Sequence, residues 1–127
     1  MSEVRALIVD DSSVMRKIIE RSLRQAGLEA LVVFEAGSGV DALEVLRSKK
    51  VDLILSDINM PSMDGLEFVR QLGMQKLAVG VPIVMITTES SEEHVKQAIM
   101  AGAKGYIRKP FTADQVKQRV LSLLSAA

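Results

Sequence analysis

Acidic, hydroxyl and basic side chains follow short strand-like runs in this sequence, at the points where the strands would end. Asp10 and Asp11 follow one run, and Asp57, Thr87 and Lys109 each close or follow another. If these runs are parallel strands of one sheet, their carboxyl ends lie at the same edge, where open α/β folds bind their ligands. We therefore expect these five side chains to converge on one site.

The types of these side chains point to phosphoryl chemistry. Carboxylates crowded together repel one another unless a cation lies among them, and their oxygens suit a hard ion such as Mg²⁺. Lys109 can approach an added phosphoryl oxygen or the carboxylate that carries it, and the Thr87 hydroxyl can donate to another oxygen. Together these groups can neutralise the charge of an in-line phosphoryl transfer. We interpret Asp57 as the nucleophile that accepts the phosphoryl group.

Each of these residues taken alone has a simpler interpretation. An aspartate or threonine after a strand commonly caps a turn, and a lysine at a strand end is commonly solvated. The shared site is favoured because such residues follow successive predicted strands.

Hydrophobic periodicity predicts five strands alternating with five helices, an order typical of a parallel sheet covered on both faces. Polar residues predict where the helices begin, and glycines where two of them end. Val40 is placed on the inward side of the second helix, and 73–80 is predicted as a loop. The predicted strands are 6–9, 31–34, 53–55, 83–86 and 105–108, and the predicted helix starts are Ser12 or Ser13, Ser38, Asp64, Ser90 and Thr112.

The composition excludes several classes of protein. A chain of 127 residues suits one domain, predicted to span residues 1–127. Sixteen basic and sixteen acidic residues cancel, so the charge suggests neither nucleic-acid binding nor membrane insertion. The absence of cysteine and the single histidine, His94, disfavour thiol chemistry, thiolate metal sites and histidine triads. With no signal pattern and no apolar run of about 20 residues, we expect a cytoplasmic protein.

Over essentially its full length the sequence resembles the receiver domains of two-component response regulators. The resemblance rests on the acidic pair, on Asp57 with the segment Met-Pro-Ser-Met-Asp-Gly at 60–65, on Thr87 and Tyr106, and on Lys-Pro-Phe at 109–111. It implies a flavodoxin-like, doubly wound five-stranded parallel sheet of strand order 2-1-3-4-5 with five helices.

The resemblance also implies a metal site and a phosphodonor. Mg²⁺ would be held by Asp10, Asp11, Asp57 and the main-chain carbonyl of Asn59. Asp11 and Asp57 would be direct ligands, and Asp10 would act through water. A histidine kinase would supply the phosphoryl group, and the protein would catalyse only its own phosphorylation and dephosphorylation.

A switch is implied in the same way. Tyr106 would move inward as Thr87 approaches the phosphoryl group, and the face formed by the fourth helix, the fifth strand and the last helix would then bind a partner protein. Asn59 and Glu89 lie two places after Asp57 and Thr87, at positions that in this family face the attacking water. They would tune the phosphate lifetime, or they are simply polar loop residues.

Two other classes of protein compete with this interpretation. Haloacid-dehalogenase-like phosphatases also combine an aspartyl nucleophile with a lysine and an acidic pair. They carry these groups in the reverse order, and Asn59 stands here where they have a general acid. A flavodoxin that binds flavin is disfavoured because Asp10 and Asp11 would repel the phosphate.

The output of a receiver is a separate question. No second domain follows Ala127, so we expect a stand-alone, monomeric regulator of the chemotaxis type. A receiver cut from a DNA-binding regulator or a hybrid kinase is the alternative.

Overall fold

The computed structural model describes residues 3–28, 30–58, 60, 63–87 and 92–125. Strands and helices alternate along this described part of the chain. Their order is β1 (Val4–Val9), α1 (Ser13–Gln25), β2 (Leu31–Ala36), α2 (Gly39–Ser48), β3 (Leu53–Asp57), α3 (Gly65–Gln75), β4 (Ile83–Thr87), α4 (Glu92–Ala101), β5 (Gly105–Arg108) and α5 (Ala113–Ser125).

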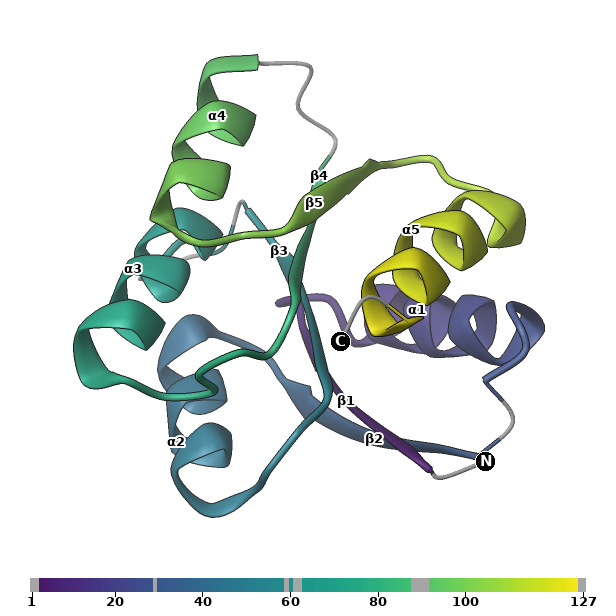
Figure 1. Cartoon of the computed structure of the whole chain (residues 1–127), viewed down its shortest axis with the longest axis horizontal. Coiled ribbons are helices and arrows are strands. Elements are labelled where there is room, and N and C mark those ends of the chain that lie inside the picture. Colours follow the sequence, from purple (N-terminus) through teal and green to yellow (C-terminus); the bar gives the residue numbers. More distant parts are fainter. Residues whose placement is uncertain (1–2, 29, 59, 61–62, 88–91, 126–127) are drawn as a thin grey trace.

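The five strands form one parallel sheet in the order β2-β1-β3-β4-β5. Helices α2, α3 and α4 cover one face, and α1 and α5 cover the other (Figure 1). The predicted doubly wound sheet and its strand order are therefore confirmed. None of the helices within the described residues is long and apolar enough to cross a membrane.

Each face of the sheet has its own core, which explains the continuous apolar runs within the inner strands. In β1, Leu7 and Val9 face α2 and α3, whereas Ala6 and Ile8 face α1 and α5. Alternate side chains of a strand point to opposite faces, so a strand covered on both sides has consecutive apolar residues rather than an alternating pattern. All four of these residues are fully buried.

The predicted helix starts agree with the observed caps. The Ser12 side chain accepts a hydrogen bond from the amide of Met15, and Ser38 and Asp64 begin α2 and α3 in the same way. Thr112 and Gln115 exchange side-chain bonds with each other's amides, which completes a capping box. Ser90 lies outside the described residues.

Two local predictions are wrong. The predicted loop at 73–80 begins too early, because α3 continues through Gly73 to Gln75 and ends at Lys76, whose φ is 54°. The predicted inward position of Val40 is also wrong, because this residue is 51% exposed. The buried face of α2 consists of Gly39, Ala42, Leu43 and Leu46, and Val40 lies outside that face.

Candidate metal and phosphoryl site

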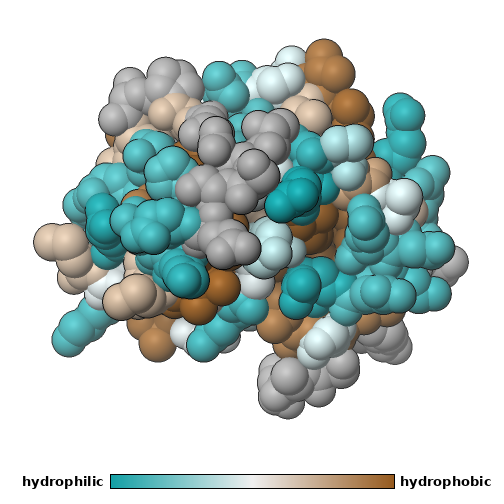
Figure 2. Space-filling model, turned by 90° about the horizontal axis from the view of Figure 1, so that it is seen from above, coloured by the Kyte–Doolittle hydropathy of each residue, from teal (hydrophilic) through white to brown (hydrophobic). Residues whose placement is uncertain are grey.

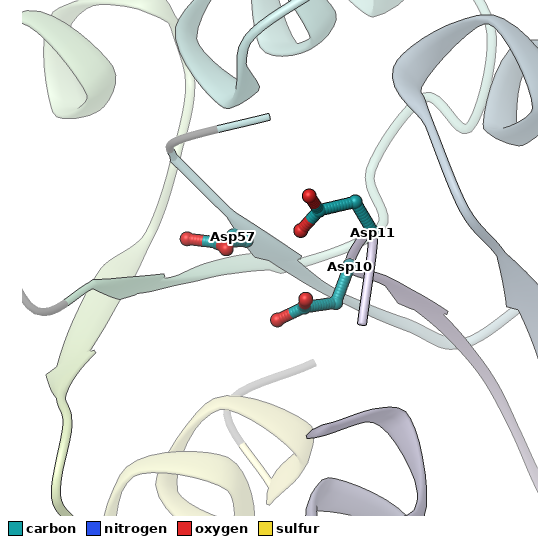
Figure 3. A group of neighbouring side chains, drawn as sticks. All are labelled: Asp10, Asp11 and Asp57. Atoms are coloured by element: carbon teal, nitrogen blue, oxygen red, sulfur yellow. The ribbon is translucent and has the colours of Figure 1, made fainter. Parts of the chain in front are cut away.

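The three predicted aspartates meet at the carboxyl edge of the sheet. β1 and β3 are neighbours whose register pairs Val9 with Ser56, so Asp10 and Asp57 follow adjacent positions. One carboxylate oxygen from each of Asp10, Asp11 and Asp57 lies within 4.8 Å of the other two. Figure 3 shows the three side chains grouped at the ends of these strands.

The three carboxylates differ in their surroundings. Asp10 is 1% exposed, and its Oδ1 accepts the Ser12 amide at 2.9 Å. Asp57 is also buried, whereas Asp11 is exposed and makes no hydrogen bond or ion pair to the residues described here. Asp11 is therefore the member of the cluster whose oxygens are most available to an ion.

Lys109 connects the two buried carboxylates. Its Nζ lies 3.3 Å from Asp10 Oδ2 and 3.5 Å from Asp57 Oδ2. Its amide donates to the carbonyl of Thr87 at 2.8 Å, which positions the lysine just beyond the end of β4. The peptide bond that follows it, to Pro110, is cis. The sequence predicted the contact of Lys109 with Asp57 but not the one with Asp10.

Thr87 closes β4 beside Asp57. The register pairs Asp57 with Ile86, and the Ile58 amide donates to the Ile86 carbonyl at 3.3 Å. Thr87 is fully buried. It is therefore one position beyond the neighbour of Asp57, inside the same edge of the sheet.

Gly65 allows α3 to begin directly against the end of β3. Its amide donates to the Ile58 carbonyl at 2.7 Å, and a Cβ at this position would lie 2.2 Å from the Asp57 carbonyl oxygen. No side chain fits in that space. The glycine at position 65 is thus explained by the close approach of α3 to the end of β3.

A second group of charged residues, Arg16, Lys17 and Glu35, contacts the backbone of the acidic pair through Arg16. Arg16 donates from Nη1 to the Asp10 carbonyl at 2.6 Å and from Nε to Glu35 Oε1 at 2.9 Å. Lys17 also binds Glu35, at 3.1 Å. The hydrogen bonds from Lys17 and Arg16 hold the pKa of Glu35 below its usual value, and Glu35 in turn raises the pKa of Lys17.

Sequence reasoning did not identify this group. The available signal was an arginine in the first helix, six residues after Asp10, together with an acid at the end of the neighbouring strand.

The donor set fits a hard divalent cation. All its side chains supply carboxylate oxygens, the ligands that Mg²⁺ accepts. Both oxygens of Asp10 already have partners, Ser12 and Lys109, which agrees with an indirect role for this residue. Asn59, the fourth predicted ligand, and Glu89, the second predicted tuning residue, lie outside the described residues.

Tyr106 lies on the neighbouring strand, at the surface. The register of β4 and β5 pairs it with Met85, two residues before Thr87, so Tyr106 and Thr87 belong to the same face of the sheet. Its side chain is 38% exposed. Figure 2 shows the β5 edge, where hydrophilic side chains surround small apolar patches.

Comparison with known proteins agrees with this arrangement. Residues 6–121 match the sequence model of the response regulator receiver domain. The chain therefore belongs to the receiver domain family. A chemotaxis protein CheY homolog of Campylobacter jejuni is 39% identical over 122 residues, which cover 95% of this chain and 92% of that protein.

Solved structures show the same fold. The chemotaxis protein CheY4 of Vibrio cholerae superposes with a TM-score of 0.85 at 34% identity, covering 96% of this chain and 99% of that one. The receiver domain of the putative response regulator NarL of Mycobacterium tuberculosis gives a TM-score of 0.87 at 27% identity, with full coverage of both chains. The chain is thus a CheY-like receiver domain.

Proposed function

We propose that this receiver accepts a phosphoryl group on Asp57 from a histidine kinase, with Mg²⁺ at the acidic cluster. The observation that carries the proposal is the pairing of one ammonium, on Lys109, with two buried carboxylates that also lie within 4.8 Å of Asp11. A capping aspartate has no need for such a cluster.

The side chains have separate tasks in this reaction. A bound Mg²⁺ supplies positive charge for the incoming phosphoryl oxygens. Asp57 provides the attacking oxygen, and Asp11 offers the most open carboxylate to the ion. Asp10, held by Ser12 and Lys109, fixes the position of the ammonium. Lys109 can then follow the new charge on Asp57, and the Thr87 hydroxyl can donate to it.

The output proposed for this reaction is a change on the face formed by α4, β5 and α5. Thr87 and Tyr106 lie on adjacent strands and on the same face of the sheet. Movement of Thr87 toward the phosphoryl group would open space that the tyrosine ring can enter. A hollow of about 320 Å³ lined by Tyr106, Arg108 and Arg119 lies on this surface and could receive part of a protein partner.

We further propose a monomeric, cytoplasmic regulator of the chemotaxis type, with no catalytic activity beyond its own phosphorylation and dephosphorylation. The support is the match with chemotaxis proteins along nearly their whole length. In this proposal Asn59 and Glu89 set the lifetime of the phosphoryl group.

Intact mass spectrometry after incubation with acetyl phosphate and Mg²⁺ tests the phosphorylation. One phosphoryl group is expected on the parent protein and none on Asp57→Asn or in the presence of EDTA. Asp41→Asn is the matched control, because Asp41 is exposed on α2 and should leave labelling intact. Equal labelling of the Asp57 variant would refute the proposed acceptor.

A further inference from the structure

Two hollows lie at the amino edge of the sheet, opposite to the edge that carries the acidic cluster. They flank the segment 76–82, which connects α3 to β4 (Figure 1). One hollow, of about 320 Å³, lies against the end of α2. The other, of about 290 Å³, lies between the ends of α3 and α4. Ala78, Val79 and Val81 line both hollows.

The segment between the hollows holds one apolar side chain in solvent. Val79 is 80% exposed, whereas Leu77 and Val81 on either side pack against the core. The turn is held by backbone hydrogen bonds from Leu77 to Leu72 at 3.0 Å and from Val81 to Ala78 at 3.1 Å. Val79 therefore contributes nothing to the core of this protein, and its side chain is accessible to a partner between the two hollows.

Four lysines surround these hollows. Lys49 and Lys50 line the first, and Lys76 and Lys104 line the second. All four are exposed, and within the described part of the chain none of their ammonium groups has a hydrogen bond or an ion pair. We refer to the two hollows with these lysines as the amino-edge surface.

Other charges near this surface are balanced. Arg47 pairs with Glu44, and Arg5 pairs with Glu3 at 3.5 Å. The acid next in the chain to the lining residues is Asp52, whose carboxylate accepts the Arg5 amide at 2.9 Å. One carboxylate beside four ammonium groups leaves the surface positive, although the whole chain has no net charge.

We propose that the amino-edge surface docks an acidic segment of another protein. Apolar side chains of that segment would fill the hollows on both sides of Val79, and its Asp or Glu residues would face the four lysines. Apolar contact at the centre with charges at the rim is the usual anatomy of a protein interface. The complementary charge also speeds association.

A protein segment fits this surface better than the other polyanions. Each hollow is concave, with room for one or two side chains, whereas binding to a lipid surface favours apolar groups that all protrude. The rim contains lysines alone, and recognition of phosphate groups commonly uses the two-pronged geometry of arginine.

The amino-edge surface lies at the opposite end of the strands from Asp57. Its occupant would therefore bind the protein with or without the phosphoryl group. This goes beyond the proposed function, because it gives the receiver a second protein contact separate from the α4-β5-α5 face.

The test uses amide NMR shifts of the whole protein during titration with a panel of short peptides that combine leucines and glutamates. Peptides with lysine in place of glutamate and vesicles containing phosphatidylserine are the comparison ligands. We expect acidic peptides to shift amides at residues 46–51, 76–81 and 101–104. The double variant Lys49→Glu/Lys76→Glu should bind about tenfold more weakly, since two attractions become repulsions.

Two further variants complete the design. Val79→Ser should weaken binding without changing the fold, because this side chain is exposed. Arg21→Glu reverses an exposed charge on α1 and should leave the affinity unchanged. The proposal is overturned if no acidic peptide shifts these amides, if both charge variants bind alike, or if the vesicles shift them and the peptides do not.

Discussion

At the scale of single residues, the site is a balance between like and unlike charges. Asp10 and Asp57 are buried and share the ammonium of Lys109, at 3.3 and 3.5 Å. Asp11 adds a third negative charge at the exposed side of the cluster. The lysine and a bound cation would therefore stabilise the site in the same way, because each offsets the negative charge of these carboxylates.

Substitutions at Lys109 and Asp11 should change stability in opposite directions. Lys109→Ala removes the ammonium that lies near both buried carboxylates and should lower the free energy of unfolding in EDTA by about 3 kcal/mol. Asp11→Ala removes one like charge and should raise it by about 1 kcal/mol, the repulsion of two charges at roughly 4 Å in water.

Urea denaturation with and without Mg²⁺ measures both effects. Mg²⁺ should restore part of the stability of Lys109→Ala and should no longer stabilise Asp11→Ala. A metal-free Asp11 variant less stable than the parent protein would show that repulsion does not govern the cluster.

At the scale of elements, the site depends on how closely neighbouring segments approach. The start of α3 touches the end of β3 because residue 65 has no side chain. The register of β4 and β5 sets Thr87 and Tyr106 on one face of the sheet. The first contact positions Asp57, the proposed phosphoacceptor, and the second is the proposed route by which its state reaches the surface.

Gly65→Ala should disturb Asp57 through its backbone. The new Cβ would lie 2.2 Å from the Asp57 carbonyl oxygen, so β3 or α3 must shift. We expect a loss of about 1–3 kcal/mol in unfolding free energy and slower labelling by acetyl phosphate. Gly73→Ala is the matched control, because it lies in the same helix with nothing within 4 Å of its Cβ. That variant should gain roughly 0.5–1 kcal/mol, and equal effects of the two substitutions would contradict the steric explanation.

Thr87→Ala should separate phosphorylation from the response of Tyr106. Beryllofluoride, which stands in for the phosphoryl group on Asp57, should change the fluorescence of the single tyrosine in the parent protein. The variant should still be labelled by acetyl phosphate but should show no fluorescence change, because it lacks the hydroxyl that is proposed to move toward the phosphoryl group. A full response in the variant would mean that the signal takes another path.

At the scale of the whole molecule, the charges sum to zero but are unevenly distributed over the surface. The sixteen basic and sixteen acidic residues cancel, yet the carboxyl edge collects aspartates and the amino edge collects lysines. At the carboxyl edge, the ion pairs of Glu35 with Arg16 and Lys17 also connect α1 to β2.

The contribution of Glu35 to stability should depend on pH in one direction. Because its pKa is lowered in the folded protein, the stabilisation is complete above its usual pKa of 4.5 and is lost as the pH falls through the lower folded value. Glu35→Gln should cost about 0.5 kcal/mol at neutral pH, as partly exposed ion pairs do, and nothing in strong acid. Urea midpoints across this pH range, with Glu44→Gln as an exposed control, measure the difference.

Much of this molecule could be predicted from its sequence, because strand ends and caps carry local signals. The apolar runs predicted the sheet, and the residues that follow them predicted the cluster. The Arg16 contact with the Asp10 carbonyl and the space at Gly65 could not be predicted, because both depend on the distance between a strand and the helix that follows it, which the sequence pattern does not define. The prediction that Val40 faces inward was wrong because helical spacing alone does not define which side of a helix meets the sheet.

The strand order has a consequence for the growing chain. β1 pairs with both β2 and β3, and β3 ends with Asp57, so all three carboxylates are synthesised before β4 and β5. Segments near the N-terminus leave the ribosome first. The repelling charges thus exist in the nascent protein before Lys109, the group that offsets them, has been made. A divalent cation bound at that stage would offset the carboxylate charges until Lys109 has been added.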